Sequence, residues 1–352
     1  MTRLWAGLDI GSETTSICVI DDTGNVVREG ECSTDLRCVR REIASFRRRR
    51  SLNIGMEAGV GIHLARGLRD LGYSVEIYEA RQLSKFLRLR RNKTDAGDAN
   101  GIAQAGRLAA PMVSKVFLKP IDCQELASRL AIRRHLIRAR AAAFRVLCCH
   151  VELFGGRLPR RVQTASFHAN AEAQLKKLFG LAPSPLASQL FELLAHCEAL
   201  VEQQRALDLD LNAEAQANPV CRRLMAVPGV GPICALTFYA AIGDPFRFRH
   251  AADVGSYFGL TPRLKQSGFS RKTGRISRMG HRYARGLLVQ ASMHFMRSAD
   301  PHLALHAWAS AIALRRGRGK SRVALARKLA TIMLAMWKKD EPFRPQLLEG
   351  VA

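Results

Sequence analysis

The first 118 residues alternate short apolar runs with amphipathic stretches. The apolar runs predict strands near residues 4–10, 15–20, 26–32, 52–57 and 74–78, and the amphipathic stretches predict helices near 35–48 and 61–71. Asp21-Asp22-Thr23-Gly24, between the second and third runs, is a hairpin turn signal. An antiparallel opening followed by strand–helix alternation predicts an α/β domain with helices packed on a mixed sheet.

Helical periodicity dominates from Pro120 to about Ala215. One seam places residues at steps of four and three, which average 3.5 and predict a coiled coil; its members are Leu186, Leu190, Leu193, Cys197, Leu200, Gln204, Leu207 and Leu211. Gln204 is its one polar member, of the kind that fixes register. An earlier helix has the heptad Leu130, Ile137, Phe144 and Val151 and ends before Gly155-Gly156. The two helices can pair within one chain or between chains.

Five arginines surround the earlier heptad: Arg133, Arg134, Arg138, Arg140 and Arg145. They form either a solvated helix face or a face that contacts phosphates.

A third segment begins near Asn218-Pro219 and is predicted to be mostly α-helical. Pro228-Gly229-Val230-Gly231-Pro232 precedes an apolar helix from Ile233 to Ala241, and Ser321 to about Lys338 is predicted to be the last helix. The glycine turn, with Gly229 and Gly231, is either a plain connector or a helix N-terminus that binds a phosphate. The predicted domains are therefore 1–118, 119–215 and 216–352.

The charge of the chain points to a polyanionic partner. The net charge is +25, and residues 216–352 contain 23 Lys and Arg against 6 Asp and Glu, a surplus of 17. Nucleic acid is the first candidate for such a surface, and an anionic membrane the second. The nine cysteines form no C-x-x-C pair, which predicts neither a zinc site nor a disulfide framework. No run of 18 apolar residues and no signal-peptide pattern is present, so we expect a cytoplasmic protein with no membrane partner.

Four carboxylates form a candidate metal site. Asp9 and Glu57 lie at the ends of two predicted strands, and Asp95 and Asp98 share one face at the start of a predicted helix. Clustered carboxylates repel unless divalent cations neutralise them, and two Mg²⁺ ions can hold the attacking and leaving oxygens of a phosphoryl transfer. The alternative to metal binding is a structural role, in which Asp9 stabilises a turn and Asp95 is the N-cap of the helix. The order of strands and helices is that of the ribonuclease H-like fold, in which Asp9 and Glu57 meet if their strands are neighbours.

A basic, glycine-punctuated segment at 259–280 is predicted to be an exposed loop. A serine here can attack a phosphodiester, with Arg263, Lys265, Arg271 and Lys272 stabilising the developing charge. Further basic residues suited to nucleic acid are Arg275, Arg278, Arg318 and Lys320.

Seven motifs in register resemble the transposases of the insertion sequence 110 family, and the related Piv-type DNA invertases share the pattern. They are Leu8-Asp9-Ile10-Gly11, Met56-Glu57-Ala58, Lys93 to Ala99, Pro228 to Pro232, Gly259 to Arg263, Gln266-Ser267-Gly268 and Ala326 to Leu329. The resemblance implies a RuvC-like domain with an Asp-Glu-Asp-Asp site, a coiled coil and a C-terminal transposase domain. It matches Asp9, Glu57, Asp95 and Asp98 to the acidic site and Ser267 to a nucleophile that forms a covalent phosphoserine. Ser270 and Ser277 lie in the same segment and are alternative nucleophiles.

The same resemblance implies Mg²⁺, which Mn²⁺ can replace, double-stranded donor and target DNA, and a structured guide RNA, the bridge RNA. It also implies a bacterial protein associated with the nucleoid. We expect a homodimer or homotetramer, joined through the 186–211 seam. The rival functions are a Mg²⁺-dependent nuclease or Holliday-junction resolvase that activates water, an actin-like sugar kinase suggested by Asp9 to Thr15, and a non-catalytic nucleic-acid-binding protein.

Overall fold

The computed structural model of the chain describes residues 3–47, 52–89, 94–108, 112–159, 166–180, 184–268 and 270–345. It forms two compact units, Met1–Leu118 and Lys119–Ala352. The predicted boundary between 215 and 216 falls inside the second unit and stays a prediction.

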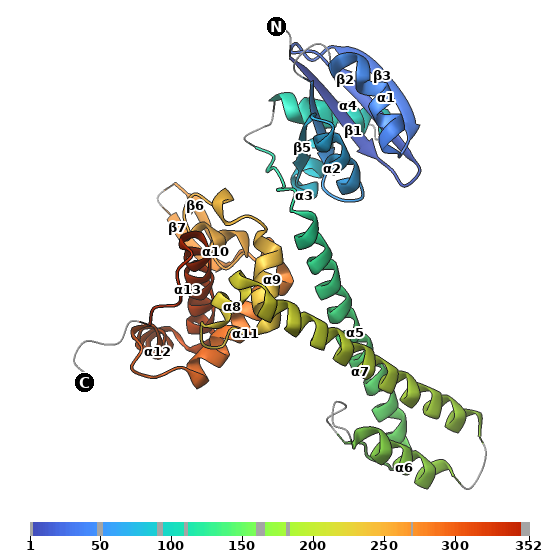
Figure 1. Ribbon diagram of the computed structural model, residues 1–352, viewed down its shortest axis with the longest axis vertical. Coiled ribbons are helices and arrows are strands. Elements are labelled where there is room, and N and C mark those ends of the chain that lie inside the picture. Colours follow the sequence, from blue (N-terminus) through green and yellow to red (C-terminus); the bar gives the residue numbers. More distant parts are fainter. Residues whose placement is uncertain are drawn as a thin grey trace. The chain divides into compact units, whose positions relative to one another are not determined.

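The first unit is a five-stranded mixed sheet with helices (Figure 1). Its strands are β1 (Leu4–Ile10), β2 (Thr14–Ile20), β3 (Val26–Ser33), β4 (Leu52–Glu57) and β5 (Ser74–Tyr78), in the order β3-β2-β1-β4-β5. Its helices are α1 (Leu36–Arg47), α2 (Ile62–Asp70), α3 (Ala80–Leu87) and α4 (Asp95–Leu108). β1 pairs antiparallel with β2 and parallel with β4. The predicted α/β class, the mixed sheet and the antiparallel opening are confirmed.

Alternation along β1 gives the two faces of the sheet different roles. Leu4, Ala6 and Leu8 are buried in a core that includes residues of α1 and α2. Trp5, Gly7 and Asp9 point to the opposite face, because successive side chains of a strand alternate. The helix on that face is α4.

Helix α4 packs directly on the backbone of β1. A Cβ at Gly7 would lie 1.9 Å from the Ala99 carbonyl oxygen and 2.5 Å from the Ala103 nitrogen, so only glycine fits there. Further along, a Cβ at Gly106 would lie 3.1 Å from the Trp5 ring. Helix α4 therefore runs antiparallel to strand β1. The first turn of α4 lies toward the Asp9 end of β1.

The second unit begins with two long helices that pair antiparallel, α5 (Ile121–Leu153) and α7 (Pro185–Ala217), with α6 (Phe167–Phe179) between them in sequence (Figure 1). The predicted seam is buried at Leu190, Cys197, Leu200, Gln204 and Leu211. Because α5 of the same chain covers that seam, the pairing is an intrachain hairpin. The expectation that residues 186–211 join two subunits is wrong for this reason.

Polar contacts inside the hairpin involve two of the predicted arginines. Buried Gln204 accepts a hydrogen bond of 2.6 Å from Arg140 and donates one of 3.1 Å to Asp208, and Arg133 forms an ion pair with Asp208. Arg133 and Arg140 thus bond to α7, whereas Arg138 and Arg145 are exposed. The solvated-face and phosphate-face alternatives stay open for this exposed pair, whereas the half-buried Arg134 lies over the Tyr283 ring, 5.2 Å from its centroid. A polar group in an otherwise apolar seam favours a single register, since any shift leaves it unpaired.

The rest of the second unit is mostly helical. Its elements are α8 (Pro219–Met225), α9 (Pro232–Ile242), the 3₁₀ turn η1 (Pro245–Arg247), α10 (Asp253–Tyr257), β6 (Pro262–Ser267), β7 (Ser270–Ile276), α11 (Arg282–Ser298), α12 (Ala304–Arg316) and α13 (Arg318–Lys339). The apolar α9 is buried within a core to which α5, α7, α11 and α13 contribute. The predicted helices at 233–241 and 321–338 are confirmed. The predicted loop at 259–280 is instead largely the β6–β7 hairpin.

His281 caps α11 in a way that depends on pH. Its Nδ1 accepts the Ala284 N–H at 3.1 Å, which requires a neutral ring. Burial, and then the positive charges of Lys119 and Arg134, lower the pKa of His281 from 6.5 to about 4. The unfolded chain therefore binds a proton that the folded chain does not bind between these values.

We expect the free energy of unfolding to fall as pH drops from 6.5 toward 4, by on the order of 1–2 kcal/mol after allowing for partial exposure. His281→Asn keeps a cap acceptor that does not titrate and should remove this component of the pH dependence. Urea denaturation of both proteins at pH 7.5 and pH 5 measures the difference. Equal pH slopes would contradict the assignment.

Candidate active site and nucleic-acid surface

Asp9 and Glu57 lie on neighbouring strands at the same end of the sheet. The β1–β4 register pairs Leu8 with Met56, so each acid comes one residue after a paired position. Alternation places both side chains on the face that α4 covers, opposite the apolar core. Asp9 is half-buried and Glu57 is exposed. The sequence left open whether these two strands are neighbours, and the structure shows that they are.

Asp95 and Asp98 occupy the first turn of α4, with Asp95 exposed and Asp98 half-buried. Thr94 caps this helix: its Oγ1 accepts the Gly97 N–H at 3.1 Å, and its carbonyl accepts the Asp98 N–H at 2.7 Å. The N-cap role considered for Asp95 belongs to Thr94. Carboxylates in a first helical turn are favoured by the helix dipole.

The structure brings these four acids to one end of the unit, but not into a closed ligand set. Among the described residues, no group of three or more His, Cys, Asp or Glu side chains meets the geometry of a metal site. The donor chemistry nevertheless suits hard divalent cations, which prefer carboxylate oxygens. The metal role of Asp9, Glu57, Asp95 and Asp98 stays a prediction.

Ser267 lies at the tip of the β6–β7 hairpin, where it pairs with Ser270 across the turn. Gly268 follows with a φ of +51°, a left-handed conformation that favours glycine in a tight turn. Both serines are exposed. The Gln-Ser-Gly motif thus encodes an exposed hydroxyl beside a glycine turn.

Ser277 differs from these two serines because it lies at the base of the hairpin. Its N–H donates to the Thr261 carbonyl at 2.8 Å, its carbonyl accepts from Arg263 at 2.9 Å, and its Oγ accepts the Met279 N–H at 3.4 Å. It is half-buried and anchors the end of β7. The geometry favours Ser267 or Ser270 over Ser277 as an attacking group.

A basic groove of about 750 Å³ runs between this hairpin and the start of α13. We call it the basic groove; its charged lining residues are Arg275, Arg278, Arg316, Lys320 and Arg327. None of its described lining residues is acidic. Such a groove attracts phosphates and becomes weaker with added salt. Arg316 and Arg327 are missing from the residues predicted to bind nucleic acid, although Arg327 lies within the Ala326 to Leu329 motif.

The other predicted binding residues divide into three groups. Arg263 bonds the Ser277 carbonyl and so braces the hairpin, and Arg318 is exposed at the start of α13. Lys265, Arg271 and Lys272 lie on β6 and β7, but their side chains are outside the described part of the structure.

The two turn glycines have different surroundings. Gly229 has a φ of +83°, and a Cβ there would lie 2.4 Å from the Ala291 carbonyl oxygen, so it serves packing against α11. Gly231 is the exposed N-cap of α9, and a Cβ there would meet nothing within 4 Å. Only Gly231 offers an open approach for a phosphate.

Arg278, a predicted nucleic-acid contact, also carries backbone strain, because its φ of +55° is unfavourable for a residue with a side chain. We expect Arg278→Gly to raise the free energy of unfolding by about 1 kcal/mol while weakening DNA binding and reducing the salt slope by about 1. Arg205→Gln, on α7, is the matched loss of an exposed arginine and should change neither property. Chemical denaturation and salt-dependent DNA titrations measure the two effects, and unchanged DNA affinity would exclude Arg278 from the contact.

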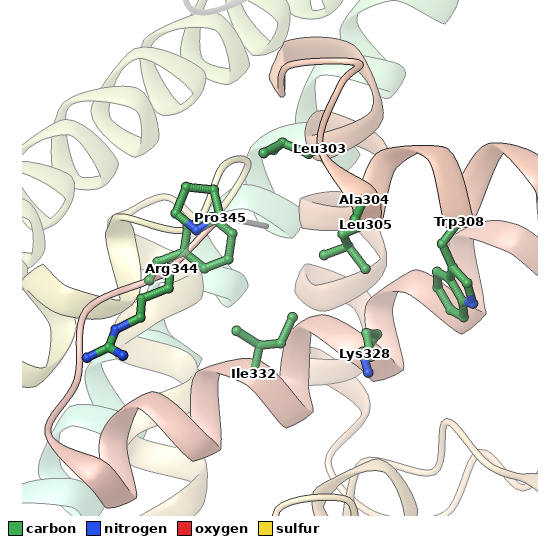
Figure 2. Close-up of a pocket in the computed structure, with 9 residues that line it drawn as sticks. Leu303, Ala304, Leu305, Trp308, Lys328, Ile332, Arg344 and Pro345 are labelled. Atoms are coloured by element: carbon green, nitrogen blue, oxygen red, sulfur yellow. The ribbon is translucent and has the colours of Figure 1, made fainter. Parts of the chain in front are cut away.

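A second pocket, of about 390 Å³, is lined by apolar side chains together with Lys328 and Arg344 and lies between α12, α13 and residues 343–345 (Figure 2). Leu305, Trp308 and Ile332 line it, with Lys328 at one side. Its lining carries no acid and no nucleophile among the described residues. It therefore adds no candidate chemistry. None of the helices that the structure describes has the length and hydrophobicity to cross a bilayer.

Comparison with known proteins agrees with this arrangement. A family model described as "Transposase IS116/IS110/IS902 family" matches residues 221–307, which include the hairpin, and a DEDD transposase model of IS110 type matches residues 6–154, which include the four acids. A probable family 20 transposase of Pseudomonas aeruginosa is 29% identical over 346 residues, covering 96% of this chain and 98% of its own. The transposase of insertion sequence element IS1111A from Coxiella burnetii is 28% identical and covers 96% and 90%.

A further relative is the pilin gene-inverting protein of Moraxella bovis, 28% identical over 144 residues, or 40% of this chain and 43% of that protein. The DEDD domain indicates dependence on a divalent metal. The residues that the two family models match lie in both units and include the four acids and the hairpin serine. The chain is a transposase of the IS110 family, an enzyme that acts on DNA.

Proposed function

We propose that the protein cuts and rejoins donor and target DNA through a covalent phosphoserine at Ser267, assisted by Mg²⁺ at Asp9, Glu57, Asp95 and Asp98. The observation that carries this proposal is the exposed serine at the tip of a hairpin whose base borders the basic groove. A groove of this kind positions a DNA backbone, and an exposed hydroxyl at the hairpin tip is accessible to a phosphodiester.

In the cleavage step the Ser267 oxygen bonds to the scissile phosphorus and loses its proton, while the bond from phosphorus to the 3′ oxygen breaks and that oxygen takes up a proton. The DNA 5′ phosphate is then esterified to the serine. In the rejoining step a 3′ hydroxyl of the exchanged strand attacks that ester and releases the serine. One phosphoester replaces another at each step, so no nucleotide cofactor is needed.

The acidic residues fit a divalent cation by their chemistry and placement. Asp9 and Glu57 would hold it from the sheet, and Asp95 and Asp98 from the first turn of α4. When bound, Mg²⁺ or Mn²⁺ supplies positive charge for the phosphate oxygens. The strand order β3-β2-β1-β4-β5 supports an RNase H-like, RuvC-like identity for this unit.

Recognition of the DNA sites is proposed to depend on a structured RNA, the bridge RNA. The family to which the chain belongs supports this proposal. A second support is the surplus of 17 positive charges over residues 216–352, because only five basic residues line the basic groove. RNA copurifying with the protein, sequenced and compared with the flanks of its own gene, tests this part.

The covalent intermediate distinguishes recombination from hydrolysis. Incubation with supercoiled DNA carrying the element ends, Mg²⁺ and any copurified RNA, followed by denaturation, should leave DNA attached to the protein by an alkali-labile ester at Ser267. Peptide mass spectrometry after nuclease digestion locates the attachment. Metal-dependent cleavage with free ends and no adduct would instead establish the alternative, a nuclease or Holliday-junction resolvase that activates water.

A further inference from the structure

The pocket between α12, α13 and residues 343–345 has the lining of a site for one nucleotide. Its volume of about 390 Å³ lies in the range of pockets that hold small ligands. Figure 2 shows Trp308 and Lys328 toward one end of the pocket and Arg344 toward the other. The rest of the lining is apolar and consists of Leu303, Ala304, Leu305, Ile332, Phe343 and Pro345. An aromatic ring, an apolar wall and two cations match the face of a base and its flanking phosphates.

The side chain of Trp308 is available for stacking. It is 40% exposed, whereas the next residue, Ala309, is buried and fixes α12 through a hydrogen bond of 2.6 Å that its carbonyl accepts from Ser321. Trp337, by contrast, is already stacked on Tyr239, with ring centroids 5.0 Å apart. Stacking on an exposed aromatic ring is a main source of affinity for unpaired bases.

Lys328 and Arg344 supply positive charge without a competing acid. Both residues are exposed, and none of the ion pairs in the described part of the chain involves either of them. Residues 301–339, which include α12 and α13, contain no Asp or Glu. Phosphate groups are therefore favoured at both ends of the pocket.

Helix α13 connects this pocket to the basic groove. Lys320 and Ala324 line the groove, and Lys328, four residues further along, lines the pocket. Residues at steps of four follow one ridge of a helix, and Lys320 and Lys328 are about 12 Å apart along its axis. At the spacing of one strand of a duplex, that distance spans about three or four phosphates. A strand held in the basic groove can thus reach the pocket with its next few nucleotides.

We propose that this pocket, which we call the Trp308 pocket, binds one unpaired nucleotide of the DNA that the basic groove holds. The base stacks on Trp308, and its flanking phosphates lie near Lys328 and Arg344. DNA is favoured over RNA because none of the nine lining side chains can accept a hydrogen bond, so a ribose 2′ hydroxyl would find no acceptor among them. The pocket binds and positions DNA, and this role needs neither Ser267 nor a metal ion.

A duplex with one unpaired base separates this contact from binding in the groove. Two labelled DNA duplexes, identical except for a single bulged thymidine, are titrated with the nucleic-acid-free full chain in the absence of metal. We expect the bulged duplex to bind about 10- to 100-fold more tightly, as for the stacking of one base. An abasic bulge has no base to stack and should lose this gain. Trp308→Ala should remove the preference and keep the affinity for the paired duplex within about twofold, and Trp308→Phe should restore part of the preference.

Leu314→Ala, on the same helix at a position that is 89% exposed, is the matched control and should keep the preference. With 2-aminopurine as the unpaired base, fluorescence should fall on binding to the wild type and not on binding to Trp308→Ala, because stacking quenches it. Circular dichroism checks the folding of the variants.

Three results would overturn the proposal. They are a wild type that binds both duplexes equally, a preference that an abasic bulge retains, and a preference that appears only with the RNA counterpart of the bulged duplex. Equal loss of affinity for both duplexes in a folded Trp308→Ala would also contradict it. Because no cleavage is measured, these results are independent of the chemistry proposed for Ser267.

Discussion

Ser267→Ala is expected to lower strand exchange by at least about 10⁴-fold and to remove the covalent protein–DNA adduct, because no other atom of the side chain can form the phosphoester. The substitution removes one exposed oxygen at a hairpin tip, so the free energy of unfolding should change little. Recombination of a reporter plasmid and gel analysis of denatured complexes measure the two losses. DNA affinity should be retained, since the basic groove is intact.

Ser270→Ala is the control for this experiment, because Ser270 is an exposed serine on the same turn and pairs with Ser267 in the hairpin. It should keep both adduct and recombination within a few fold. An adduct that persists in Ser267→Ala and disappears in Ser270→Ala would move the nucleophile to Ser270. Ser277→Ala is expected to affect stability rather than chemistry, because the Ser277 hydroxyl accepts the Met279 N–H at the base of the hairpin.

Asp98→Asn is expected to reduce cleavage by on the order of 10²- to 10⁴-fold and to remove the effect of metal on stability. If the four carboxylates bind Mg²⁺ or Mn²⁺, the metal stabilises the folded wild-type protein by mass action, and chelation lowers its melting temperature. The amide retains the shape of the side chain but provides a weaker ligand. The variant should therefore melt at one temperature with and without Mn²⁺.

Thermal denaturation with Mn²⁺ or with a chelator provides this comparison independently of activity. Glu31→Gln, at an exposed position on the edge strand β3, is the control and should keep the metal response of the wild type. A full metal response in Asp98→Asn would remove Asp98 from the ligand set. Loss of cleavage together with a retained metal response would restrict its role to the DNA.

The sequence predicts those helices and strands along which buried and exposed side chains alternate with a regular period. Strands β1, β2, β4 and β5 and the heptads of α5 and α7 could be located because one face of each is packed against a core. Strand β3 is exposed almost throughout, and the hairpin turn signal Asp21-Asp22-Thr23-Gly24 that precedes it indicated its position. The β6–β7 hairpin could not, because its sequence is polar on both faces and Leu264 is 60% exposed. Backbone hydrogen bonds rather than a buried side define that hairpin.

The candidate site shows the same division. Asp9 and Glu57 were predicted to converge because strand ends are visible in the apolar pattern, and their strands are neighbours. The basic groove depends on a contact between residues near 275 and residues near 320, and nothing in either segment specifies the other. Arg316 can therefore be recognised as part of the basic groove only from the structure. The heptads are likewise compatible with pairing within one chain or between chains. Only the tertiary structure shows that α5 of the same chain covers the 186–211 seam.

The two ends of the antiparallel α5–α7 hairpin pack in separate cores, so the length of the hairpin between them can vary. Leu126, Leu130, Leu211 and Ala215, at its base, belong to the C-terminal core, and Arg129 forms an ion pair with Glu214 there. The far end packs in a separate apolar cluster with α6. Removing one heptad from each helix between these two regions would leave both ends of the hairpin side by side and its seam in phase. Such a deletion would shorten the arm by two turns of each helix without moving Ser267 relative to the C-terminal core.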